Sequence, residues 1–340
     1  MNDNFKSKIL ITGAGGFIGG HLVTEALARG MEVWAAVRAT TSREFLTDER
    51  IHFIVLDFTD YASLESTISN HIVEHGTWDY IVHNLGATKA TGYLDFERIN
   101  YGYMKMLVDV LRGLGALPRV FLLMSSLSVM GAGDEVGYTP FDDNSIPSPN
   151  TRYGTSKLKA ETYLQSIEGM PYTIFRCTGV YGPHERDYYM MLKSINRGVD
   201  FGVGFKKQLL TFIYVKDLAA AVMDALERGP LRRAYYISEP RSYTQAEFRE
   251  LARKLLGKAL VIPIKCPLWV VKAVCAVAER WGKWTGKPST LNSDKFNILK
   301  QRNWQCDISA AQRDFGFNPQ YDLEHGLQES IEWYRNNGWL

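Results

Sequence analysis

Two side chains four residues apart, Tyr153 and Lys157, are of the types that proton transfer requires. They open the stretch YGTSKLKAETYL, which is typical of a helix, and their spacing places both on one helix face. An ammonium group beside a phenol favours the phenolate and lowers the tyrosine pKa from about 10 towards neutral pH. We therefore expect Tyr153 to exchange a proton with a bound molecule, with Lys157 lowering its pKa. Because this spacing is common in proteins, the surrounding elements must support the interpretation.

A serine-rich segment, Ser125–Gly131, follows the apolar run Val120–Met124, which predicts a strand. Hydroxyl groups at the C-terminal end of a parallel strand lie where open α/β sheets bind ligands. We therefore expect Ser126 to hold an oxygen of the reacting molecule beside Tyr153. For Ser128, a role in binding and a role in satisfying backbone groups of the loop are equally open.

Glycines recur at every third residue in ILITGAGGFIG, at Gly13, Gly16 and Gly19. The loop follows a predicted strand, Lys8–Thr12, and opens a predicted helix, Phe17–Arg29, as a dinucleotide site requires. Glycine permits the tight turn and the close approach of a pyrophosphate, and the helix N-terminus offers free N–H groups. The loop therefore predicts a dinucleotide cofactor.

The end of the second predicted strand, Glu32–Val37, indicates which dinucleotide is bound. NAD sites usually place an acidic residue there, but this chain continues with Arg38. A guanidinium pairs well with a 2′-phosphate, so we expect NADP(H), with NAD(H) as the alternative. Arg38 as a solvated loop residue is the other interpretation. Asp57 either accepts a hydrogen bond from the adenine or caps a helix over Tyr61–Ile72.

Short apolar runs alternate with helical stretches through the first half of the chain. Further predicted strands are His52–Leu56, Tyr80–His83 and Thr173–Arg176. Nearly continuous apolar strands separated by helices are typical of a parallel sheet buried on both faces. The expected fold is α/β: a Rossmann-type doubly wound parallel sheet with a smaller interleaved C-terminal substrate lobe. Residues 1–180 would form the dinucleotide-binding core, and 181–340 would complete it and form the lobe.

The overall composition favours a globular protein that acts on a small molecule. Hydrophobic residues make up 46% and charged residues 22% of the chain, and the net charge is only +2 without a dense Lys/Arg run, so nucleic acid is not an expected partner. The four cysteines form no CxxC pair and no metal-ligand spacing with histidine, so neither a disulfide framework nor a metal site is expected. Cysteines of this kind and the absence of a signal-peptide pattern favour the cytoplasm.

One stretch, Pro267–Trp284, is rich in apolar residues. Charged residues interrupt it, and its unbroken apolar part is too short to span a bilayer, so no integral membrane segment is expected. A buried or amphipathic helix is favoured here over an anchor on a membrane surface.

Taken together, these segments resemble the extended short-chain dehydrogenases/reductases, also called the NAD-dependent epimerase/dehydratase family. TGAGGFIG is similar to the family's glycine motif, and SSLSVMG to its serine segment, with Met130 where tyrosine is common. Tyr153 and Lys157 match its active-site pair. Arg176–Pro183 resembles the segment that borders the nicotinamide, and Phe212–Leu218 resembles a motif at the substrate lobe. The resemblance covers nearly the whole chain.

The resemblance implies a catalytic triad of Ser126, Tyr153 and Lys157 and a structural role for Asn100. It also implies a homodimer, formed through the helices that hold Asn100–Leu114 and Tyr153–Ile167. The residues expected at the cofactor are Gly13, Gly16, Phe17, Ile18, Gly19, Arg38, Asp57, Phe58, Gly86, Ala87, Ser125, Tyr153, Lys157, Cys177 and Val180. Those expected at the substrate are Thr88, Ser128, His184, Tyr188 and Tyr189, although loop packing is an equal alternative for the last three.

Within the family, two segments favour a reductase that interconverts a ketone and a secondary alcohol by hydride transfer. VRAT, which begins at Val37, resembles the NADP-preferring reductases of the dihydroflavonol reductase and 3β-hydroxysteroid dehydrogenase branch. Leu127 and Ser128 stand where the dehydratases carry an acidic pair. The apolar segment Leu260–Gly286 resembles the lobe of the hydroxysteroid branch, so the expected substrate is a fairly apolar small molecule, steroid- or flavonoid-like.

Two alternatives stay open. A nucleotide-sugar epimerase or dehydratase would hold NAD tightly, and Lys206, Lys207 and Arg241 would then be available for a phosphate. A non-catalytic, dinucleotide-sensing scaffold would not require the triad. Outside the triad, His83 is expected to be a packed core histidine. The default for Cys177 is a small buried hydrophobe, with redox sensitivity as the alternative.

Overall fold

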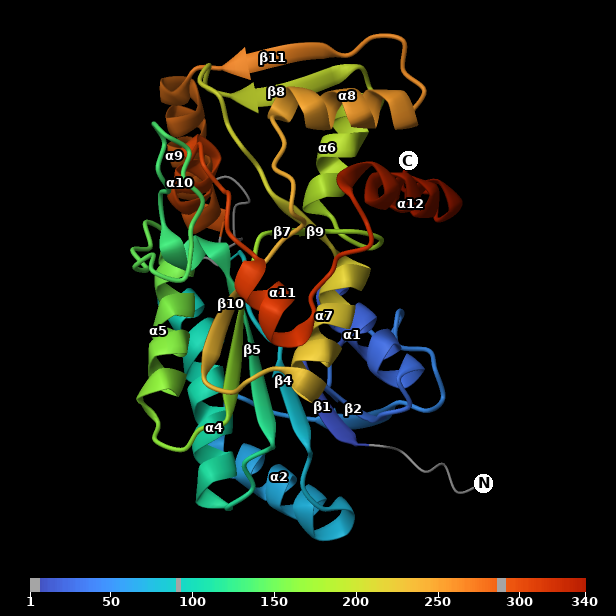
Figure 1. Cartoon of the computed structure of the whole chain (residues 1–340), viewed down its shortest axis with the longest axis vertical. Helices are drawn as coiled ribbons and strands as arrows, with labels where there is room; N and C mark the ends of the chain where they lie inside the picture. The colour runs from blue at the N-terminus through green and yellow to red at the C-terminus, as the bar shows by residue number, and fades with distance from the viewer. Residues whose placement is uncertain (1–6, 90–92, 286–291) are drawn as a thin grey trace.

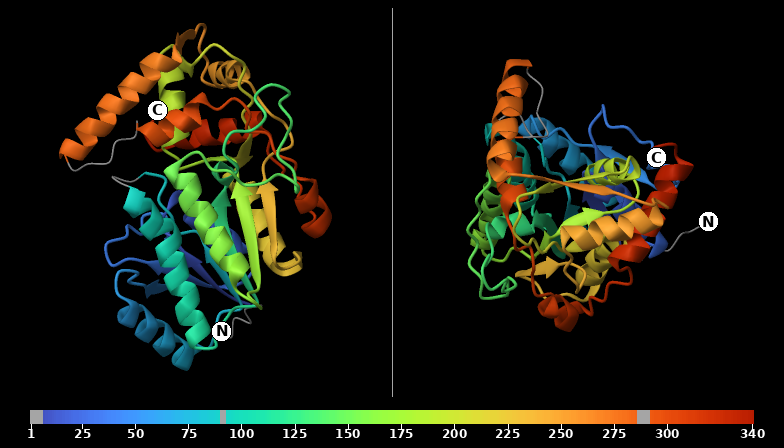
Figure 2. Two further views of the ribbon diagram at one scale, coloured as in Figure 1. Left: turned by 90° about the vertical axis from the view of Figure 1, so that its left-hand side faces the viewer. Right: turned by 90° about the horizontal axis from the view of Figure 1, so that it is seen from above.

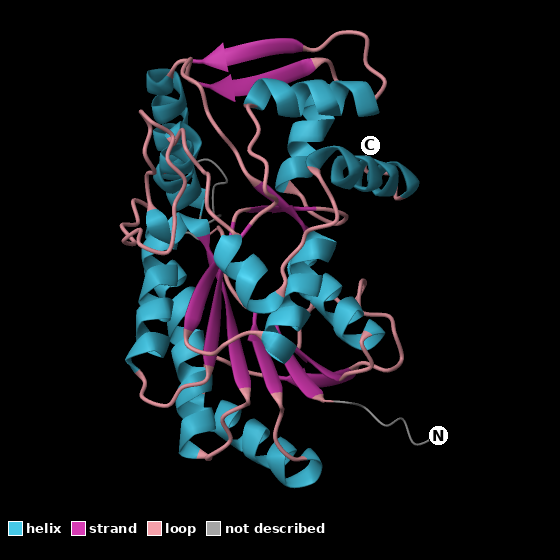
Figure 3. Ribbon diagram, in the orientation of Figure 1, coloured by secondary structure: helices cyan, strands magenta, loops and turns pink. Residues whose placement is uncertain are grey.

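The short apolar runs of the first half form one parallel sheet in the computed structural model, which describes residues 7–89, 93–285 and 292–340 (Figures 1 and 3). The seven strands lie in the order β10-β6-β5-β4-β1-β2-β3. Their bounds are β1 Lys8–Thr12, β2 Glu32–Val37, β3 His52–Val55, β4 Tyr80–His83, β5 Val120–Ser126, β6 Tyr172–Cys177 and β10 Arg233–Ile237. Residues 1–6, 90–92 and 286–291, and with them the end of the predicted apolar segment Leu260–Gly286, lie outside the described residues. The sheet confirms the predicted α/β fold.

Helices cover both faces of this sheet, which explains why its strands are apolar on both sides. One hydrophobic cluster joins the sheet to α1, α7 and α11, and a second joins its other face to α2, α4 and α5. The bounds of these helices are α1 Phe17–Ala28, α2 Tyr61–His75, α4 Tyr103–Gly113, α5 Arg152–Ser166, α7 Val215–Arg228 and α11 Ser309–Phe315. Figure 1 shows the two layers.

The smaller lobe lies beyond the carboxyl edge of the sheet (Figure 1). It contains two short parallel pairs, β7 with β9 and β8 with β11. The bounds are β7 Gly179–Tyr181, α6 Asp187–Asn196, β8 Val199–Val203, β9 Phe212–Tyr214, α8 Gln245–Leu255, β11 Ile262–Cys266, α9 Leu268–Thr285, α10 Ser293–Lys300 and α12 Leu323–Asn336. A third cluster of buried apolar side chains, from α6, α8 and α12 among others, forms its core.

The core and the lobe are interleaved along the chain. After β6 and β7, the chain forms α6 and β8 in the lobe and then returns to the core through α7 and β10, which pairs with β6. Residues after 181 therefore complete the sheet as well as form the lobe. None of the helices in the described ranges is long and apolar enough to cross a bilayer.

The sheet edge that faces the lobe is the edge at which the predicted site residues lie. β1 has β2 on one side and β4 on the other, so the strand order reverses there. Open α/β sheets bind ligands in the crevice at such a reversal. Strand β5 runs beyond the predicted Met124, so that Ser126 is still paired with Cys177 of β6.

Candidate active site

The glycine loop after β1 is shaped for the close approach of a phosphate. Gly13 has φ of +67°, and a Cβ atom there would lie 3.0 Å from the Leu85 backbone. A Cβ atom on Gly19 would lie 2.1 Å from the Gly13 carbonyl oxygen. Any side chain at these two positions would force the loop apart, so the sequence requires glycine for the turn and for the contact between helix and strand.

The N-terminus of α1 supplies the groups that would hold that phosphate. Gly16 is the residue that precedes the first turn, and it has no side chain to occupy the N–H groups behind it. Phe17 and Ile18 open the helix and are half-buried; Ile18 packs against the core. Free N–H groups and the positive end of the helix dipole favour an anion. The loop and helix therefore fit a dinucleotide pyrophosphate, as predicted.

The segment after β2 lies against this loop. A Cβ atom on Gly15 would lie 2.3 Å from Thr41 Cγ2, and the Arg38 N–H donates to Thr41 Oγ1 (3.0 Å). The Arg38 side chain is exposed. Its guanidinium is therefore accessible to solvent at the end of β2.

The two residues predicted after β3 differ in orientation. Asp57 does not cap α2, since the cap is Asp60, which accepts hydrogen bonds from the first turn. Asp57 is exposed and accepts from the Thr59 N–H (2.8 Å) and hydroxyl, and these bonds lower its pKa. Phe58 is buried and its ring packs on Tyr103, so its side chain serves the core. The prediction that Phe58 borders the cofactor is therefore not supported by its side chain.

Ser126, Tyr153 and Lys157 meet at the carboxyl end of β5. The Ser126 side chain lies beside that of Tyr153 and lowers the tyrosine pKa. Ser126 Oγ also donates to Ser128 Oγ (3.2 Å), so Ser128 lies beside the pair. Lys157 is buried, and its Nζ donates to the Met124 carbonyl of β5 (2.8 Å). The hydroxyl groups of Ser126 and Tyr153 thus lie together at the carboxyl end of β5.

Burial sets the pKa values of this group, and the direction for tyrosine is opposite to the prediction. Desolvation raises the pKa of Tyr153 to about 12, although the bond with Ser126 lowers it. Desolvation also lowers the pKa of Lys157 to about 8, opposed by Cys177 and Glu161. The structure does not show the expected lowering of the tyrosine pKa by the ammonium group, because desolvation dominates the pKa of Tyr153 and Lys157 Nζ donates to the Met124 carbonyl. At neutral pH Tyr153 is protonated and able to donate.

Asn100 connects the end of β4 with α5. It lies in a π-helical turn, Arg98–Gly102, between α3 (Tyr93–Glu97) and α4. Its oxygen accepts from the Ala87 N–H (2.7 Å), and its amide donates to the Ala87 carbonyl (3.1 Å) and to Ser156 Oγ (2.9 Å). Irregular π turns are frequent at functional sites. The predicted structural role of this residue agrees with its contacts.

Gly86 brings the loop after β4 against Lys157. A Cβ atom on Gly86 would lie 3.0 Å from Lys157 Nζ and 3.1 Å from Asn100 Oδ1. Gly86 is exposed on its other side, and Ala87 follows it. The glycine therefore allows this loop to pack closely against Lys157 and Asn100.

The lobe holds α5 at its first turn, and the sequence analysis did not predict these contacts. Asp294 of α10 accepts a hydrogen bond from the Tyr153 N–H (3.1 Å). Arg152 lies 3.9 Å from Glu279 of α9. Thr151 caps α5 by accepting from the Gly154 N–H (2.9 Å). The cap is visible in the sequence as a threonine before the helix, but no local pattern links residues 153 and 294.

Three further cofactor candidates, at the ends of β5 and β6 and in β7, are buried or partly buried. Ser125 donates to Glu161, which also pairs with Arg176 (2.7 Å). Its hydroxyl is thereby directed into the protein, so the predicted cofactor contact is not made by this side chain. Cys177 is buried, and desolvation raises its thiol pKa to about 12, which supports the small-hydrophobe interpretation over a redox role. Val180 packs partly buried against the core.

The five substrate candidates separate into two groups. Thr88 is exposed beside Lys89, which pairs with Asp187 of α6 (2.7 Å) and so bridges core and lobe. A Cβ atom on Gly179 would lie 2.1 Å from the Tyr188 hydroxyl, so that tyrosine reaches the segment after β6. Ser128 therefore lies beside Ser126, Tyr188 lies against Gly179 of β7, and Thr88 is exposed next to Lys89.

His184 and Tyr189 are directed elsewhere. His184 has φ of +74° and packs on Phe45 and Trp333, with ring centroids 3.6 Å and 4.4 Å away. The Tyr189 hydroxyl donates to the Trp339 carbonyl (2.5 Å) near the C-terminus. For these two residues, the loop-packing alternative is the better description, because their contacts stabilise the lobe.

His83 is a core histidine, as predicted. It is fully buried, its Nδ1 lies 3.1 Å from Thr12 Oγ1, and burial lowers its pKa to about 3. An uncharged ring in this place joins β4 to β1 and takes no part in proton exchange.

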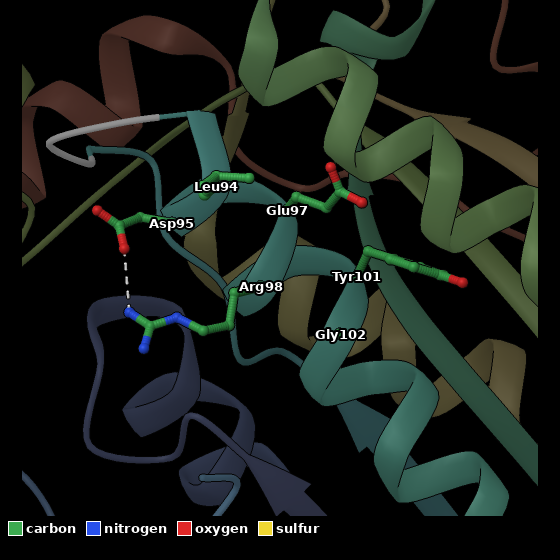
Figure 4. A pocket seen from close by; sticks show the side chains of 6 residues that line it. All are labelled: Leu94, Asp95, Glu97, Arg98, Tyr101 and Gly102. Atoms are coloured by element: carbon green, nitrogen blue, oxygen red, sulfur yellow. Dashed lines mark hydrogen bonds and ion pairs between the residues drawn. The ribbon is translucent and has the colours of Figure 1, made fainter.

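An open hollow lies on the outer side of the π-helical turn (Figure 4). Arg98 pairs there with Asp95 (3.0 Å). Its lining is Leu94, Asp95, Glu97, Arg98, Tyr101 and Gly102, and none of the predicted catalytic residues belongs to it. Within the described ranges, no group of three or more His, Cys, Asp or Glu is placed to hold a metal ion.

The sequence is similar to those of known proteins. The model of the NAD dependent epimerase/dehydratase family matches residues 9–238. A ceramide reductase of Caulobacter vibrioides is 25% identical, over 100% of this chain and 98% of that protein. A dTDP-glucose 4,6-dehydratase of Xanthomonas campestris is 24% identical over 96% and 93%. A UDP-glucose 4-epimerase of Vibrio cholerae is 25% identical over 95% and 94%.

Solved structures share the fold at lower identity. A UDP-glucose 4-epimerase of Thermotoga maritima, with UDP-glucose, has a TM-score of 0.77 at 21% identity, over 97% of this chain and 99% of that chain. A dTDP-glucose 4,6-dehydratase of Streptomyces venezuelae, with NAD bound, has a TM-score of 0.77 at 20% identity, over 98% of both chains. Both support the arrangement of sheet and lobe described above.

Proposed function

The chain belongs to the NAD dependent epimerase/dehydratase family of enzymes, and we propose that it is an NAD(P)-dependent oxidoreductase that interconverts a ketone and a secondary alcohol. The observation that carries this proposal is the pair Ser126–Tyr153 at the end of β5, next to Leu127 and Ser128. Both neighbours are buried and neither is acidic. A dehydratase needs an acid to expel water, whereas ketone reduction needs one proton donor and a group that holds the oxygen.

The residues of the chain have distinct roles in this reaction. Tyr153 donates its hydroxyl proton to the ketone oxygen, and Ser126 donates a hydrogen bond that holds that oxygen in place. Lys157, buried beside Gly86, stabilises negative charge that develops on the tyrosine oxygen. Asn100 keeps the loop after β4 at a fixed distance from α5. The dinucleotide, when bound, supplies the hydride.

We propose a mainly apolar substrate. A relative that spans the whole chain is named a ceramide reductase, which supports an amphiphilic ketone. A ketone on a steroid- or flavonoid-like ring system is the other apolar substrate that we propose.

We propose NADP(H) as the cofactor, with NAD(H) as the alternative. Arg38 is exposed beside the glycine loop, and the strand before it ends in Val37 rather than in a carboxylate. The neighbours solved with NAD support a dinucleotide at this place without favouring either form.

A nucleotide-sugar epimerase is the second candidate, because most of the related proteins compared carry names of nucleotide-sugar enzymes. Lys206 and Lys207 are exposed in the lobe and are available for a diphosphate, while Arg241 pairs with Glu247 (3.0 Å). An epimerase returns the hydride to its substrate, so its cofactor is not consumed.

One experiment separates these candidates. The purified protein is analysed for bound nucleotide, titrated with NADPH and NADH by fluorescence, and then assayed with long-chain keto lipids, steroid ketones, UDP-sugars and dTDP-sugars. The proposal predicts NADPH oxidation with an apolar ketone and no reaction of the sugars. Tightly held NAD with sugar conversion and no net oxidation would establish the epimerase instead. Binding of NADPH without turnover in any arm would favour the sensing scaffold.

We also propose a homodimer through α4 and α5. Tyr101 and Tyr163 pack together on this face, and Lys105 pairs with Asp109 there. A Tyr163→Asp variant should shift the mass measured by light scattering from dimer to monomer. An unchanged mass would place the interface elsewhere, or show that the protein is a monomer already.

A further inference from the structure

Helix α9 carries an apolar face that the described protein leaves uncovered. Trp269, Ala273, Val277, Trp281 and Trp284 recur at intervals of three or four residues, so they lie on one side of the helix. Trp269 is 74%, Val277 67%, Trp281 63% and Trp284 78% exposed. Single exposed apolar residues are ordinary, but a continuous row of this size marks an interaction surface.

The opposite side of α9 is the side that packs on the protein. Cys275 and Gly282 are buried there, and Glu279 accepts hydrogen bonds from the Ser293 N–H (3.1 Å) and hydroxyl at the start of α10. Figure 2 shows α9 at the margin of the lobe, protruding beyond the rest of the molecule in the right-hand view. The helix is therefore held on one side, and its tryptophans point outward. The predicted helix is confirmed, but its apolar residues are exposed rather than buried.

Apolar exposure continues into the segments next to α9. Ile262 and Ile264 of β11, directly before the helix, are exposed. A Cβ atom on Gly204 would lie 3.6 Å from the Leu268 side chain, which places the loop after β8 beside the start of α9. Phe205 in this loop is also exposed.

Basic residues border this surface. Lys272 and Arg280 are exposed on α9, and Lys265, Lys206 and Lys207 are exposed in the adjoining strand and loop. From residue 257 to residue 285 the chain contains a single acidic residue, Glu279, and it is turned towards the protein. The surface therefore combines tryptophans with a one-sided positive charge.

We propose that this face of α9 docks on the surface of an anionic lipid bilayer. The helix lies in the plane of the interface: its tryptophans and valines enter the boundary between headgroups and acyl chains, and Lys272 and Arg280 contact the lipid phosphates. Tryptophan suits this depth because its ring is apolar and its N–H stays hydrated. A second copy of the chain is a poorer occupant, because it would bring the same basic side chains, while the one acidic residue of α9, Glu279, is turned towards the protein.

Docking here would bring the catalytic edge close to the lipid. Arg152 contacts Glu279 of α9, and the next residue, Tyr153, is held by Asp294 of α10. The α9–α10 pair is thus fixed to the first turn of α5. Membrane binding does not rest on the proposed reaction, so it is testable without any substrate.

The test is sedimentation of the full chain with vesicles of phosphatidylcholine alone or mixed with phosphatidylglycerol. Binding to the mixed vesicles is expected, with at most weak binding to phosphatidylcholine. Trp269→Gln/Trp284→Gln should lower the partition coefficient by at least about tenfold. Val277→Gln should lower it several-fold, whereas Val73→Gln, which changes a valine that is 83% exposed on α2, should leave it unchanged.

Charge is tested separately. Lys272→Gln/Arg280→Gln should weaken binding to the mixed vesicles by about tenfold or more and reduce its dependence on salt. Arg197→Gln, at an exposed arginine after α6, is the matched control and should change little. Circular dichroism of each variant confirms that the protein is folded.

Three results would overturn the proposal. Wild-type protein that stays in the supernatant with both vesicles excludes docking. Equal loss of binding in the Val73 and Val277 variants shows that α9 is not the contact. A shift from dimer to monomer in the Val277 variant, measured by light scattering, assigns the face to a second copy.

Discussion

Helices α5 and α9 touch through Arg152 and Glu279, yet their residues meet opposite surroundings. Helix α5 buries polar side chains: Lys157, Ser156 and Glu161 are all inside the protein. Helix α9 exposes apolar ones, including three tryptophans. Each helix departs from the usual rule that apolar residues are inside and charged residues outside.

The difference between α5 and α9 indicates which helix belongs to the reaction site and which belongs to a binding surface. A buried polar group is stable only with fixed partners, so the contacts of α5 hold its side chains in one arrangement. An exposed apolar side chain has few such constraints and is free to meet a partner. We infer that the α5 edge determines the reaction and that α9 determines what the protein binds.

The largest effect is expected at Tyr153. Tyr153→Phe removes the donated proton and should lower kcat by about 100- to 10,000-fold. NADPH affinity, measured by fluorescence titration, and vesicle binding should be retained, because neither needs the hydroxyl. Turnover within a factor of about three of wild type would refute the role of this tyrosine.

Next is the glycine loop, with two neighbouring glycines as a matched pair. Gly19→Ala should lower the free energy of unfolding by about 3 kcal/mol, since its Cβ would lie 2.1 Å from the Gly13 carbonyl. It should also weaken NADPH binding. Gly20→Ala has its nearest contact at 3.9 Å and should change stability by no more than about 1 kcal/mol. Urea denaturation measures both, and equal losses would contradict the close packing at Gly19.

The burial of Lys157 should also make the free energy of unfolding depend on pH. The folded protein lowers the pKa of Lys157 from 10.5 to about 8, so the unfolded chain binds the proton more tightly. Stability therefore rises with pH above 8. Relative to Lys157→Met, the wild-type free energy of unfolding should increase by about 2 kcal/mol between about pH 8 and pH 10.

This difference isolates the lysine, because Tyr153 and Cys177 are present in both proteins. Their raised pKa values act in the opposite direction, since the unfolded chain loses those protons first. Parallel pH profiles of wild type and variant, measured by denaturation, would mean that Lys157 is not desolvated.

A substitution of Arg38, the exposed residue after β2, should have a smaller effect, and only on cofactor binding. Arg38→Gln is expected to raise the Kd of NADPH by about tenfold and to leave that of NADH nearly unchanged, because only NADPH carries the 2′-phosphate. Fluorescence titration with both nucleotides gives the comparison. Equal changes would assign Arg38 to the solvated loop.

The smallest effect is expected on α9. Val277→Gln should change the free energy of unfolding by less than about 0.5 kcal/mol, because the side chain is largely exposed. Val108→Gln, at a fully buried valine of α4, should cost about 3 kcal/mol. A large loss at Val277 would show that α9 is covered by protein in solution, and the contrast between the two helices would fail.

Local patterns in the sequence were sufficient for much of the fold and of the site. Apolar runs such as Tyr80–His83 predict strands because each is buried on both faces. The glycine spacing predicts the loop after β1. Gly13 and Gly19 are only six residues apart in the sequence, and the first turn of α1 brings Gly19 against the Gly13 carbonyl. The triad is likewise brought together by one strand and the helix that follows it.

Other features depend on residues that are far apart in the chain, and only the tertiary structure decided them. Asn100 binds Ser156, and Tyr153 is held by Asp294; no local pattern links these partners. The direction of the Tyr153 pKa shift follows from burial, which is a property of the assembled site.

The exposure of the apolar residues of α9 was also decided by the tertiary structure. The sequence alone determined that α9 is a helix with apolar and basic residues, because the spacing of apolar residues that predicts a helix lies within one short segment. Whether those apolar residues meet a core or solvent depends on how the lobe packs, and the structure turns them outward. The sequence by itself thus determined the chemistry of the site, while packing between distant segments decided its protonation, its support and the surface left for a partner.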